Sequence, residues 1–402
     1  MSHQPSMPCS RLLFKTAIAA LAVAGFSLTT VNAYAEDGVT KTSIRFGQSA
    51  ALSGPSKNLG RSMRAGILAA FEEVNQAGGI KGRKLVLETV DDGYEPVRAA
   101  SNTKAFAAAG NIFAFIGNVG TPTSRAAQPI ATEKGIPFVA PYTGAKFLRD
   151  PQLTNVVNIR ASYDQEAEAW IQYAVDDKGF SRVAIFYQDD SYGKAGLRAT
   201  EKALGLRNLK LVGKGAYHRN QIDVDNAVAL IAKSKPDVIA MVGSYEACAE
   251  FIKKVKAMGI RPLFLNLSFV GSKSLSDSLG RDRKGVIISE VVPEPGGSSP
   301  IAIDYRRAMG IAFPNEDHTH VSLEGYIAGR FVSDVLRRMR GSITRQSFLS
   351  TIRNNRSFVL GELKLVFGPL DNQGLDDVHL SVLEVDGSLR PITKTRSIPQ
   401  SN

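Results

Sequence analysis

Cysteine is scarce in this 402-residue chain, which contains only Cys9 and Cys248. Cys9 lies in an N-terminal segment that we expect to be removed, so the mature chain keeps Cys248 alone and can form no internal disulfide. A disulfide framework is thereby excluded. We predict that Cys248 is a small buried apolar side chain within a helix.

The motifs of common catalytic and nucleotide-binding sites are also missing. The sequence contains no H-E-x-x-H, G-x-S-x-G, Walker A or Rossmann G-x-G-x-x-G motif. His318 and His320 are spaced for a strand-borne metal site, but no cysteine or third histidine lies near them, so we expect a solvated loop there. We predict a protein that is not an enzyme and uses no cofactor or metal.

Long apolar runs are absent beyond the N-terminus, so we predict no membrane span. The first 35 residues combine positive charges at Arg11 and Lys15, an apolar stretch at 16–28 and an A-x-A sequence at 33–35. The apolar stretch is shorter than the roughly 20 residues of a transmembrane helix. We therefore predict a cleaved signal peptide over 1–35 and an exported, periplasmic protein beginning at Glu36.

The chain is basic overall, but the distribution of its charges does not indicate a particular binding partner. The net charge is +11, and removal of Arg11 and Lys15 lowers it to +9. The basic residues are dispersed, and the densest run, 337–340, precedes Gly341 at a predicted helix end, where it complements the helix dipole. No stripe of aromatic and basic residues is present, so we predict no nucleic-acid partner.

The segment 44–96 contains one βαβ unit. A strand at 44–48 is followed by the turn Leu52-Ser53-Gly54-Pro55 and by an amphipathic helix that ends at the glycines of 75–79. A second strand at 85–87 ends in Asp91-Asp92. Such units build doubly wound parallel sheets, which places the chain in the α/β class.

Similar units repeat along the chain. We predict further strands at 112–116, 136–139, 182–187, 209–212, 238–242, 263–265, 286–288, 363–366 and 379–385, and long helices at 246–258, 322–339 and 346–353. Fully apolar runs such as 238–242 are typical of parallel strands that are buried on both faces. The length and the repeats indicate two similar α/β lobes.

Three turns together resemble one family. The L-S-G-P turn, the connection Asn75-x-x-Gly78-Gly79-Ile80-x-Gly82-Arg83-Lys84 and the strand end Asp91-Asp92-x-x-x-Pro96 are similar to the branched-chain amino-acid-binding proteins of bacterial ABC importers. The resemblance implies a type I periplasmic binding protein fold, in which two Rossmann-like lobes are joined by a three-stranded hinge. It also implies a small-molecule ligand, an inner-membrane ABC permease as partner, and a monomer.

The resemblance further implies where the lobes are divided. The N-terminal lobe would comprise 36–160 and 291–366, and the C-terminal lobe 161–290 and 367–402. Crossings near 160–161, 289–292 and 367–370 would form the hinge, and the ligand would lie between the lobes at the loops that follow the strands.

Two loops of the first lobe are candidate ligand contacts. Thr121 or Thr123 can cap the helix that follows, and small residues with a helix N-terminus form a site for a carboxylate. The resemblance implies that the Thr121 hydroxyl binds the ligand carboxylate. In the second loop, Gly144 stands where the family has a threonine, while Thr143 precedes it and Tyr142 adds an aromatic wall.

Two loops of the second lobe supply the other candidates. Tyr192 and Tyr245 match family tyrosines that cover the ligand. Tyr326, in the late helix of the first lobe, matches a further aromatic wall position. Asp190 is an ordinary helix cap and also a candidate ligand contact. Ser268 stands where amino-acid-binding members have a glutamate for the α-ammonium group.

The ligand class remains open between two alternatives. A buried ammonium group needs a charged partner, so the chain either supplies another acid, Asp190 or Glu246, or binds a carboxylate or amide that lacks the ammonium group. A second function is also open, in which the same lobes present a ligand to a receptor or regulator rather than to a permease.

Overall fold

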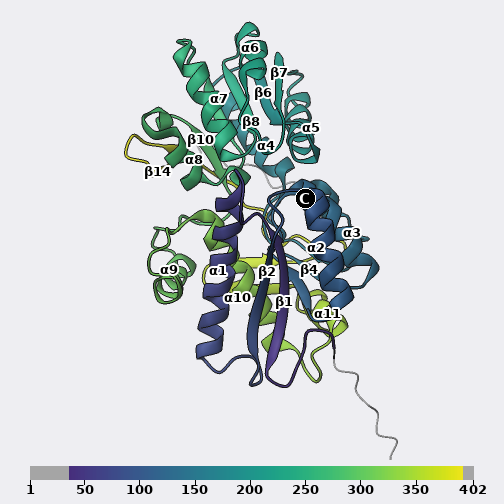
Figure 1. Cartoon of the computed structure of the whole chain (residues 1–402). Coiled ribbons are helices and arrows are strands. Elements are labelled where there is room, and N and C mark those ends of the chain that lie inside the picture. Colours follow the sequence, from purple (N-terminus) through teal and green to yellow (C-terminus); the bar gives the residue numbers. More distant parts are fainter. Residues whose placement is uncertain (1–35, 393–402) are drawn as a thin grey trace, which may run out of the picture. The chain divides into compact units, whose positions relative to one another are not determined.

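A computed structural model describes residues 36–392 (Figure 1). The predicted signal peptide and the last ten residues of the predicted C-terminal lobe lie outside the described residues. No helix in the described part is long and apolar enough to cross a membrane.

The first sheet has five parallel strands in the order β2-β1-β3-β4-β5. Its strands are β1 (Ser43–Ala50), β2 (Lys84–Asp91), β3 (Ala114–Ile116), β4 (Phe138–Val139) and β5 (Val156–Val157). The order changes direction around β1, as in doubly wound sheets. The loops that follow β3 and β4 carry the candidate residues of the first lobe.

Helices cover both faces of this sheet (Figure 1). They are α1 (Lys57–Gln76), α2 (Pro96–Ala109), α3 (Thr121–Glu133), α9 (Pro300–Ala312), α10 (His320–Arg338) and α11 (Arg345–Asn355). Helices α1 and α10 pack most closely, because a Cβ atom on Gly66 would lie 1.8 Å from the Ser322 carbonyl oxygen. The late segment 320–338 thus packs against the helix that follows β1.

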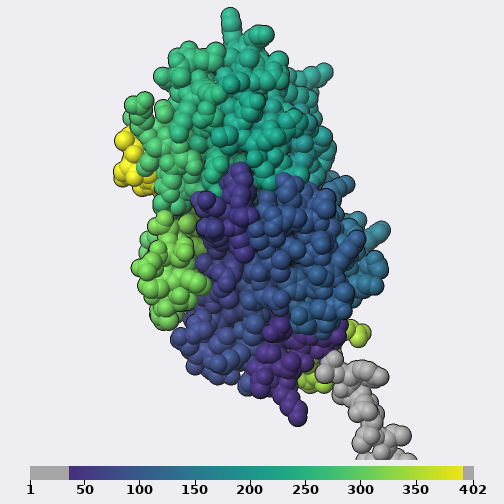
Figure 2. Space-filling model, viewed as in Figure 1, coloured from purple at the N-terminus to yellow at the C-terminus, as the bar shows by residue number. Residues whose placement is uncertain are grey.

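The second sheet has seven strands in the order β14-β13-β10-β9-β8-β6-β7. Its strands are β6 (Val183–Gln188), β7 (Gly213–Tyr217), β8 (Val238–Val242), β9 (Leu263–Asn266), β10 (Ile287–Glu290), β13 (His379–Leu383) and β14 (Leu389–Pro391). The five strands up to β10 are parallel, whereas β13 and β14 pair antiparallel. The end of the described chain, yellow in Figure 2, lies at the surface beside the green part of this sheet.

The helices of the second lobe follow its strands. They are α4 (Tyr163–Ile171), which continues into a π-helical segment (Gln172–Asp177), α5 (Ser191–Gly205), α6 (Asp225–Lys233), α7 (Tyr245–Ala257) and α8 (Ser272–Leu279). Short 3-10 helices lie at Lys146–Arg149, Ser268–Val270 and Gly280–Arg283. Cys248 is fully buried in α7, which confirms that prediction.

Two of the crossing segments are joined by backbone hydrogen bonds. The Asn158 N–H donates to the Asn372 carbonyl at 2.7 Å, and the Leu375 N–H donates to the Ile159 carbonyl at 2.8 Å. The hairpin of β11 (Ser357–Leu360) and β12 (Leu363–Val366) precedes the last crossing. The two sheets are therefore linked through short paired backbone segments.

The expected α/β class is confirmed, but some expected elements are wrong. The strand expected at 209–212 is a loop, and β7 begins at Gly213, where pairing with Ala184 starts. Gly215 permits this strand to pack close to α6, because its Cβ atom would lie 2.9 Å from Ala227. Helix α2 was not predicted because it buries only Ala99, Thr103 and Phe106.

Candidate functional site

A group of hydroxyls lies at the carboxyl ends of β3 and β4. Thr121 Oγ1 and Thr143 Oγ1 are 2.6 Å apart, and the Thr143 hydroxyl also donates to Tyr163 Oη at 3.2 Å. All three side chains are buried. Two loops of the first lobe and the first residue of α4 thus bring neutral donors and acceptors together.

Neither threonine caps the helix, so the expected capping role is wrong. The N-cap residue of α3 is Gly120, with φ of 104° and no side-chain cap, while Thr121 is already helical. Thr123 instead donates its hydroxyl to the Val119 and Gly120 carbonyls. The Thr121 hydroxyl is consequently available to Thr143 rather than to the helix backbone.

Gly144 allows Tyr163 to lie against the second loop. A Cβ atom at Gly144 would be 2.5 Å from the Tyr163 ring and 2.7 Å from its backbone nitrogen. The Tyr163 N–H donates to the Gly144 carbonyl at 2.8 Å. A threonine does not fit at this position, which explains why the sequence has glycine here and its hydroxyl at Thr143.

Phe269 is the centre of an aromatic cluster to which both lobes contribute. Its ring centroid lies 4.6 Å from Tyr192, 5.3 Å from Tyr142 and 6.0 Å from Tyr94. Tyr163 extends the cluster, with its centroid 5.6 Å from Tyr192. All five rings are buried, so the candidate residues Tyr142 and Tyr192 share one apolar wall.

Tyr94 is held in an unusual backbone conformation. Its φ is 63°, a region that bulky residues rarely adopt, and its N–H donates to Asp92 Oδ1 at 2.8 Å. Burial raises the pKa of Asp92 to about 6. Backbone strain of this kind concentrates at functional sites. The hydroxyls of Tyr94 and Tyr192 are buried without a hydrogen-bond partner among the described residues.

Asp190 caps α5 as expected. Its carboxylate accepts from the Tyr192 N–H at 2.9 Å, from Gln188 at 2.6 Å and from Arg219 at 3.1 Å. The same Arg219 contacts Glu95 of the first lobe at 2.8 Å. The carboxylate of Asp190 is therefore committed to protein donors.

Tyr245 and Tyr326 lie apart from the Phe269 cluster in their contacts. Tyr245 Oη accepts from the Asn58 N–H at 3.5 Å, at the start of α1. Tyr326 Oη donates to Glu73 at 2.7 Å and accepts from Arg330 at 2.6 Å, at the interface of α1 and α10. The described contacts of Tyr326 join helices of the first lobe to each other.

Ser268 lies in a buried ionic cluster. Its N–H and hydroxyl donate to the two carboxylate oxygens of Glu166 at 2.8 and 3.0 Å. Arg160 donates to the Ser268 hydroxyl, and its guanidinium lies 4.6 Å from the centre of the Tyr142 ring. The ionic cluster therefore contacts the aromatic cluster at Tyr142 and Ser268.

Several of these residues escaped the sequence analysis. Tyr94 lies two residues after Asp92 at a strand end, and Tyr163 directly follows the helix cap residue Ser162. These neighbours were the only local sequence features that could have pointed to the two tyrosines. Phe269 is the residue after Ser268. Arg160 was placed at a crossing, but no sequence pattern pairs it with Glu166, because that pairing arises only when the two sheets are linked.

The comparisons with known proteins now identify the fold family. A family model described as "Periplasmic binding protein" matches residues 43–387. The chain belongs to the periplasmic binding protein family. A solved structure of a possible leucine/isoleucine/valine-binding protein from Rhodopirellula baltica SH 1 is 35% identical. It has a TM-score of 0.84, and the match covers 90% of this chain and 98% of that one.

Other similar proteins have names that indicate the same family. The Leu/Ile/Val-binding protein BraC3 of Rhizobium johnstonii is 30% identical over 249 residues, which cover 60% of this chain and 65% of that protein. The chain thus spans just under two thirds of the length of this curated relative. A leucine binding protein LivK from Thermotoga maritima shares the fold, with a TM-score of 0.77, 19% identity and coverage of 87% and 98% of the two chains. The predicted family resemblance is confirmed.

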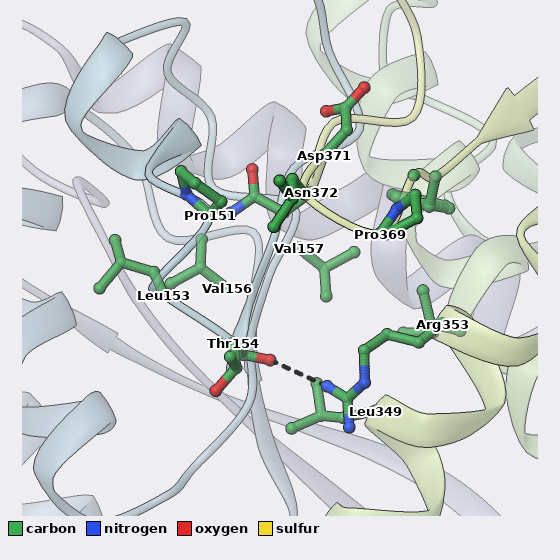
Figure 3. A pocket seen from close by; sticks show the side chains of 14 residues that line it. Pro151, Leu153, Thr154, Val156, Val157, Leu349, Arg353, Pro369, Asp371 and Asn372 are labelled. Atoms are coloured by element: carbon green, nitrogen blue, oxygen red, sulfur yellow. Dashed lines mark hydrogen bonds between the residues drawn. The ribbon is translucent and has the colours of Figure 1, made fainter.

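Two hollows of this periplasmic binding protein lie elsewhere. One, of about 60 Å³, is formed by the segment 151–157, α11 and the loop 367–372, with Arg353 donating to the Thr154 carbonyl (Figure 3). Another, of about 300 Å³, is lined by His318, His320 and Glu294 among others. Neither is lined by a candidate ligand residue. Within residues 36–392 no group of three or more acidic, histidine or cysteine side chains is placed for a metal ion.

Proposed function

We propose that this chain is the substrate-binding component of an ABC importer of the branched-chain amino-acid type. It binds a small carboxylate-bearing ligand between its lobes, works in the periplasm after export, and delivers the ligand to an inner-membrane permease without catalysing a reaction. The relatives named as Leu/Ile/Val-binding proteins support this class.

The observation that carries the proposal is the junction of the hydroxyl group with the aromatic cluster. Thr121 and Thr143 supply neutral hydroxyls beside the start of α3, a helix N-terminus that favours an anionic group. The rings of Tyr142, Tyr192 and Phe269 supply an apolar wall. A ligand with a carboxylate at one end and an apolar body matches this arrangement.

The candidate residues divide into two roles under this proposal. Thr121, Tyr142, Thr143, Gly144, Tyr192 and Ser268 face the ligand directly or shape the loops that do. Thr123, Asp190, Tyr245 and Tyr326 hold neighbouring backbone and helices, since their polar atoms are bonded to other parts of the protein. The hydroxyls of Tyr192 and of Tyr94 are buried without a partner among residues 36–392, which makes Tyr94 a further candidate for a ligand contact.

Lobe closure around the ligand is the expected mode of action. Residues of both lobes already meet at Phe269, so a bound ligand adds contacts to the closed arrangement and favours it over an open one. The closed form would then present one continuous surface to the permease. Binding energy, rather than bond making, performs the work.

A thermal-shift screen tests the function. The protein from Glu36 onward is melted with apolar amino acids and with matching carboxylic acids and amides that lack the amino group. A ligand that binds only the folded state raises the melting temperature with concentration. Stabilisation by at least one carboxylate is expected. If no compound of the panel shifts the melting temperature at millimolar concentration, the proposal fails.

A further inference from the structure

We infer that Arg160 determines the ligand class and that the interlobe site takes an apolar carboxylate without an α-ammonium group. The inference rests on the proposed function and narrows it to one of the two ligand classes. It is drawn from the hydrogen bonds and ion pairs that the charged side chains around Ser268 make.

The acid nearest to Ser268 has no capacity left for a ligand. Glu166 is fully buried, and one carboxylate oxygen accepts from the Ser268 hydroxyl while the Arg160 guanidinium lies 3.6 Å away. The other oxygen accepts from the Ser268 N–H and from the Ser289 hydroxyl. A carboxylate offers about four acceptor positions, and all four face protein donors.

The next acids are also committed. Asp190 accepts from three donors, one of them the cation Arg219. Glu324 is buried 3.7 Å from Arg160, and its burial raises its pKa to about 7, so it carries only part of a negative charge at neutral pH. The two acids that lie within 4 Å of Arg160, Glu166 and Glu324, are therefore not free as counter-ions for an ammonium group.

Two guanidinium groups support the same loops. Arg160 is 1% exposed and lies over the Tyr142 ring, and Arg149 donates to the Thr143 and Ala145 carbonyls at 3.4 and 3.0 Å. An ammonium group at this end of the site would face two cations in a poorly solvated environment, where like charges interact strongly. A carboxylate would instead be attracted by both guanidinium groups, which Glu166 and, in part, Glu324 counterbalance.

Arg160 itself has unused donors. Its Nε and Nη1 atoms are buried without a hydrogen-bond acceptor among the described residues, although Nη1 lies 3.7 Å from Glu324. A buried, unpartnered donor on a cation is costly. Arg160 lies over the ring of Tyr142, the residue before Thr143, so the ligand carboxylate that we place beside Thr143 is the acceptor that satisfies it best. Ser268 joins this polar end to the ring of Phe269, the next residue, which receives the apolar body.

Paired ligands test the inference on the protein from Glu36 onward. Isothermal titration calorimetry at neutral pH compares 4-methylpentanoate with leucine, and 3-phenylpropanoate with phenylalanine. The acid of at least one pair is expected to bind 100-fold or more tightly than its amino acid. If an amino acid binds as tightly as its matching acid, the inference is overturned while the proposed function stands. If no member of either pair binds and no compound of the thermal-shift panel stabilises the protein, the proposed function itself fails.

A charge-balanced variant tests the residue. Arg160→Gln combined with Glu166→Gln removes one charge of each sign, and we expect the acid-to-amino-acid preference to fall at least tenfold. Arg160→Lys keeps the cation and is expected to retain the preference. The matched control, Arg207→Gln with Glu168→Gln, removes a pair joined at 2.7 Å between the loop after α5 and α4, and leaves the preference unchanged. An unchanged preference in the first variant would contradict the role of Arg160, and the wild-type comparison decides the ligand class even if that variant does not fold.

Discussion

Thr121 Oγ1 and Thr143 Oγ1 lie 2.6 Å apart, so two loops that follow neighbouring strands share one hydrogen bond. Each hydroxyl can both donate and accept. The Thr121 hydroxyl makes no bond to the backbone of α3, whereas the Thr143 hydroxyl also accepts from the Ala145 N–H at 3.2 Å. The pair is therefore arranged to reorient toward a ligand carboxylate without breaking secondary structure.

Removal of the Thr121 hydroxyl is expected to weaken ligand binding. Thr121→Ala deletes one hydrogen bond to a charged group, which costs about 1–3 kcal/mol. Thr121→Ser keeps the hydroxyl and serves as the control, with affinity near that of the wild type. Calorimetry with the tightest-binding acid measures both variants. Equal affinities of the alanine and serine variants would remove Thr121 from the carboxylate site.

Substitution of Gly144 is expected to destabilise the protein. Gly144→Ala places a methyl group 2.5 Å from the Tyr163 ring, and overpacking of this kind costs roughly 1–3 kcal/mol. Gly310 in α9 is the matched control, because a Cβ atom there meets nothing within 4 Å. Gly310→Ala is expected to raise stability slightly by helix propensity. Denaturant melts that showed equal effects for both variants would contradict this packing.

The same glycine shows what the sequence could and could not supply. The βα pattern predicts β1, β3, β4 and the loops after them, and together with the family resemblance it identifies Thr121, Tyr142 and Thr143 as candidates. The partner of Gly144 is Tyr163, nineteen residues away at the start of α4, and no periodicity links the two. Thr121 or Thr123 was expected as a cap, but Gly120 is the N-cap residue of α3 and the Thr123 hydroxyl donates to backbone carbonyls instead.

The ionic cluster could not be predicted from the sequence for a related reason. Arg160, Glu166 and Glu324 come from a crossing segment, from α4 and from α10, and only the linking of the two sheets brings them within 4 Å. Sequence patterns describe one element at a time. Contacts among three elements that lie far apart along the chain depend on the tertiary fold.

The stability of the protein is expected to be greater at pH 5.5 than at pH 8.5. Burial raises the pKa of Glu290 and of Glu324 to about 7. Burial alone would lower the pKa of His320, but the carboxylates of Glu290 and Glu294 raise it above its ordinary value. All three groups hold protons more tightly when folded, so their contribution is present at acid pH and is lost as the pH rises through these pKa values.

Melting curves at the two pH values measure this effect. For Glu324→Gln, which mimics the protonated side chain, the difference in stability between the two pH values is expected to shrink by an amount on the order of 1–3 kcal/mol. Glu316→Gln, at an exposed position, is the control and leaves the difference unchanged. Greater stability of the wild type at pH 8.5 would contradict the assigned direction.

The thiol of Cys248 is expected to be unreactive. Cys248 is fully buried in α7, and burial raises the pKa of its thiol, so little thiolate forms. Labelling of the protein from Glu36 onward with a disulfide reagent is expected to be slow when folded and complete in denaturant. Rapid labelling of the folded protein would show that α7 opens readily.

Tyr326 is expected to affect stability but not ligand binding. The family resemblance made it a candidate aromatic wall, whereas its hydroxyl joins Glu73 of α1 to Arg330 of α10. Tyr326→Phe keeps the ring and leaves both partners without this bond, which costs about 1–2 kcal/mol of unfolding free energy. Tyr192→Ala is the comparison, because it removes a ring that packs 4.6 Å from Phe269, and we expect it to weaken binding. A tenfold loss of ligand affinity in Tyr326→Phe would instead place its hydroxyl at the ligand, and the interface of α1 and α10 would then belong to the binding site.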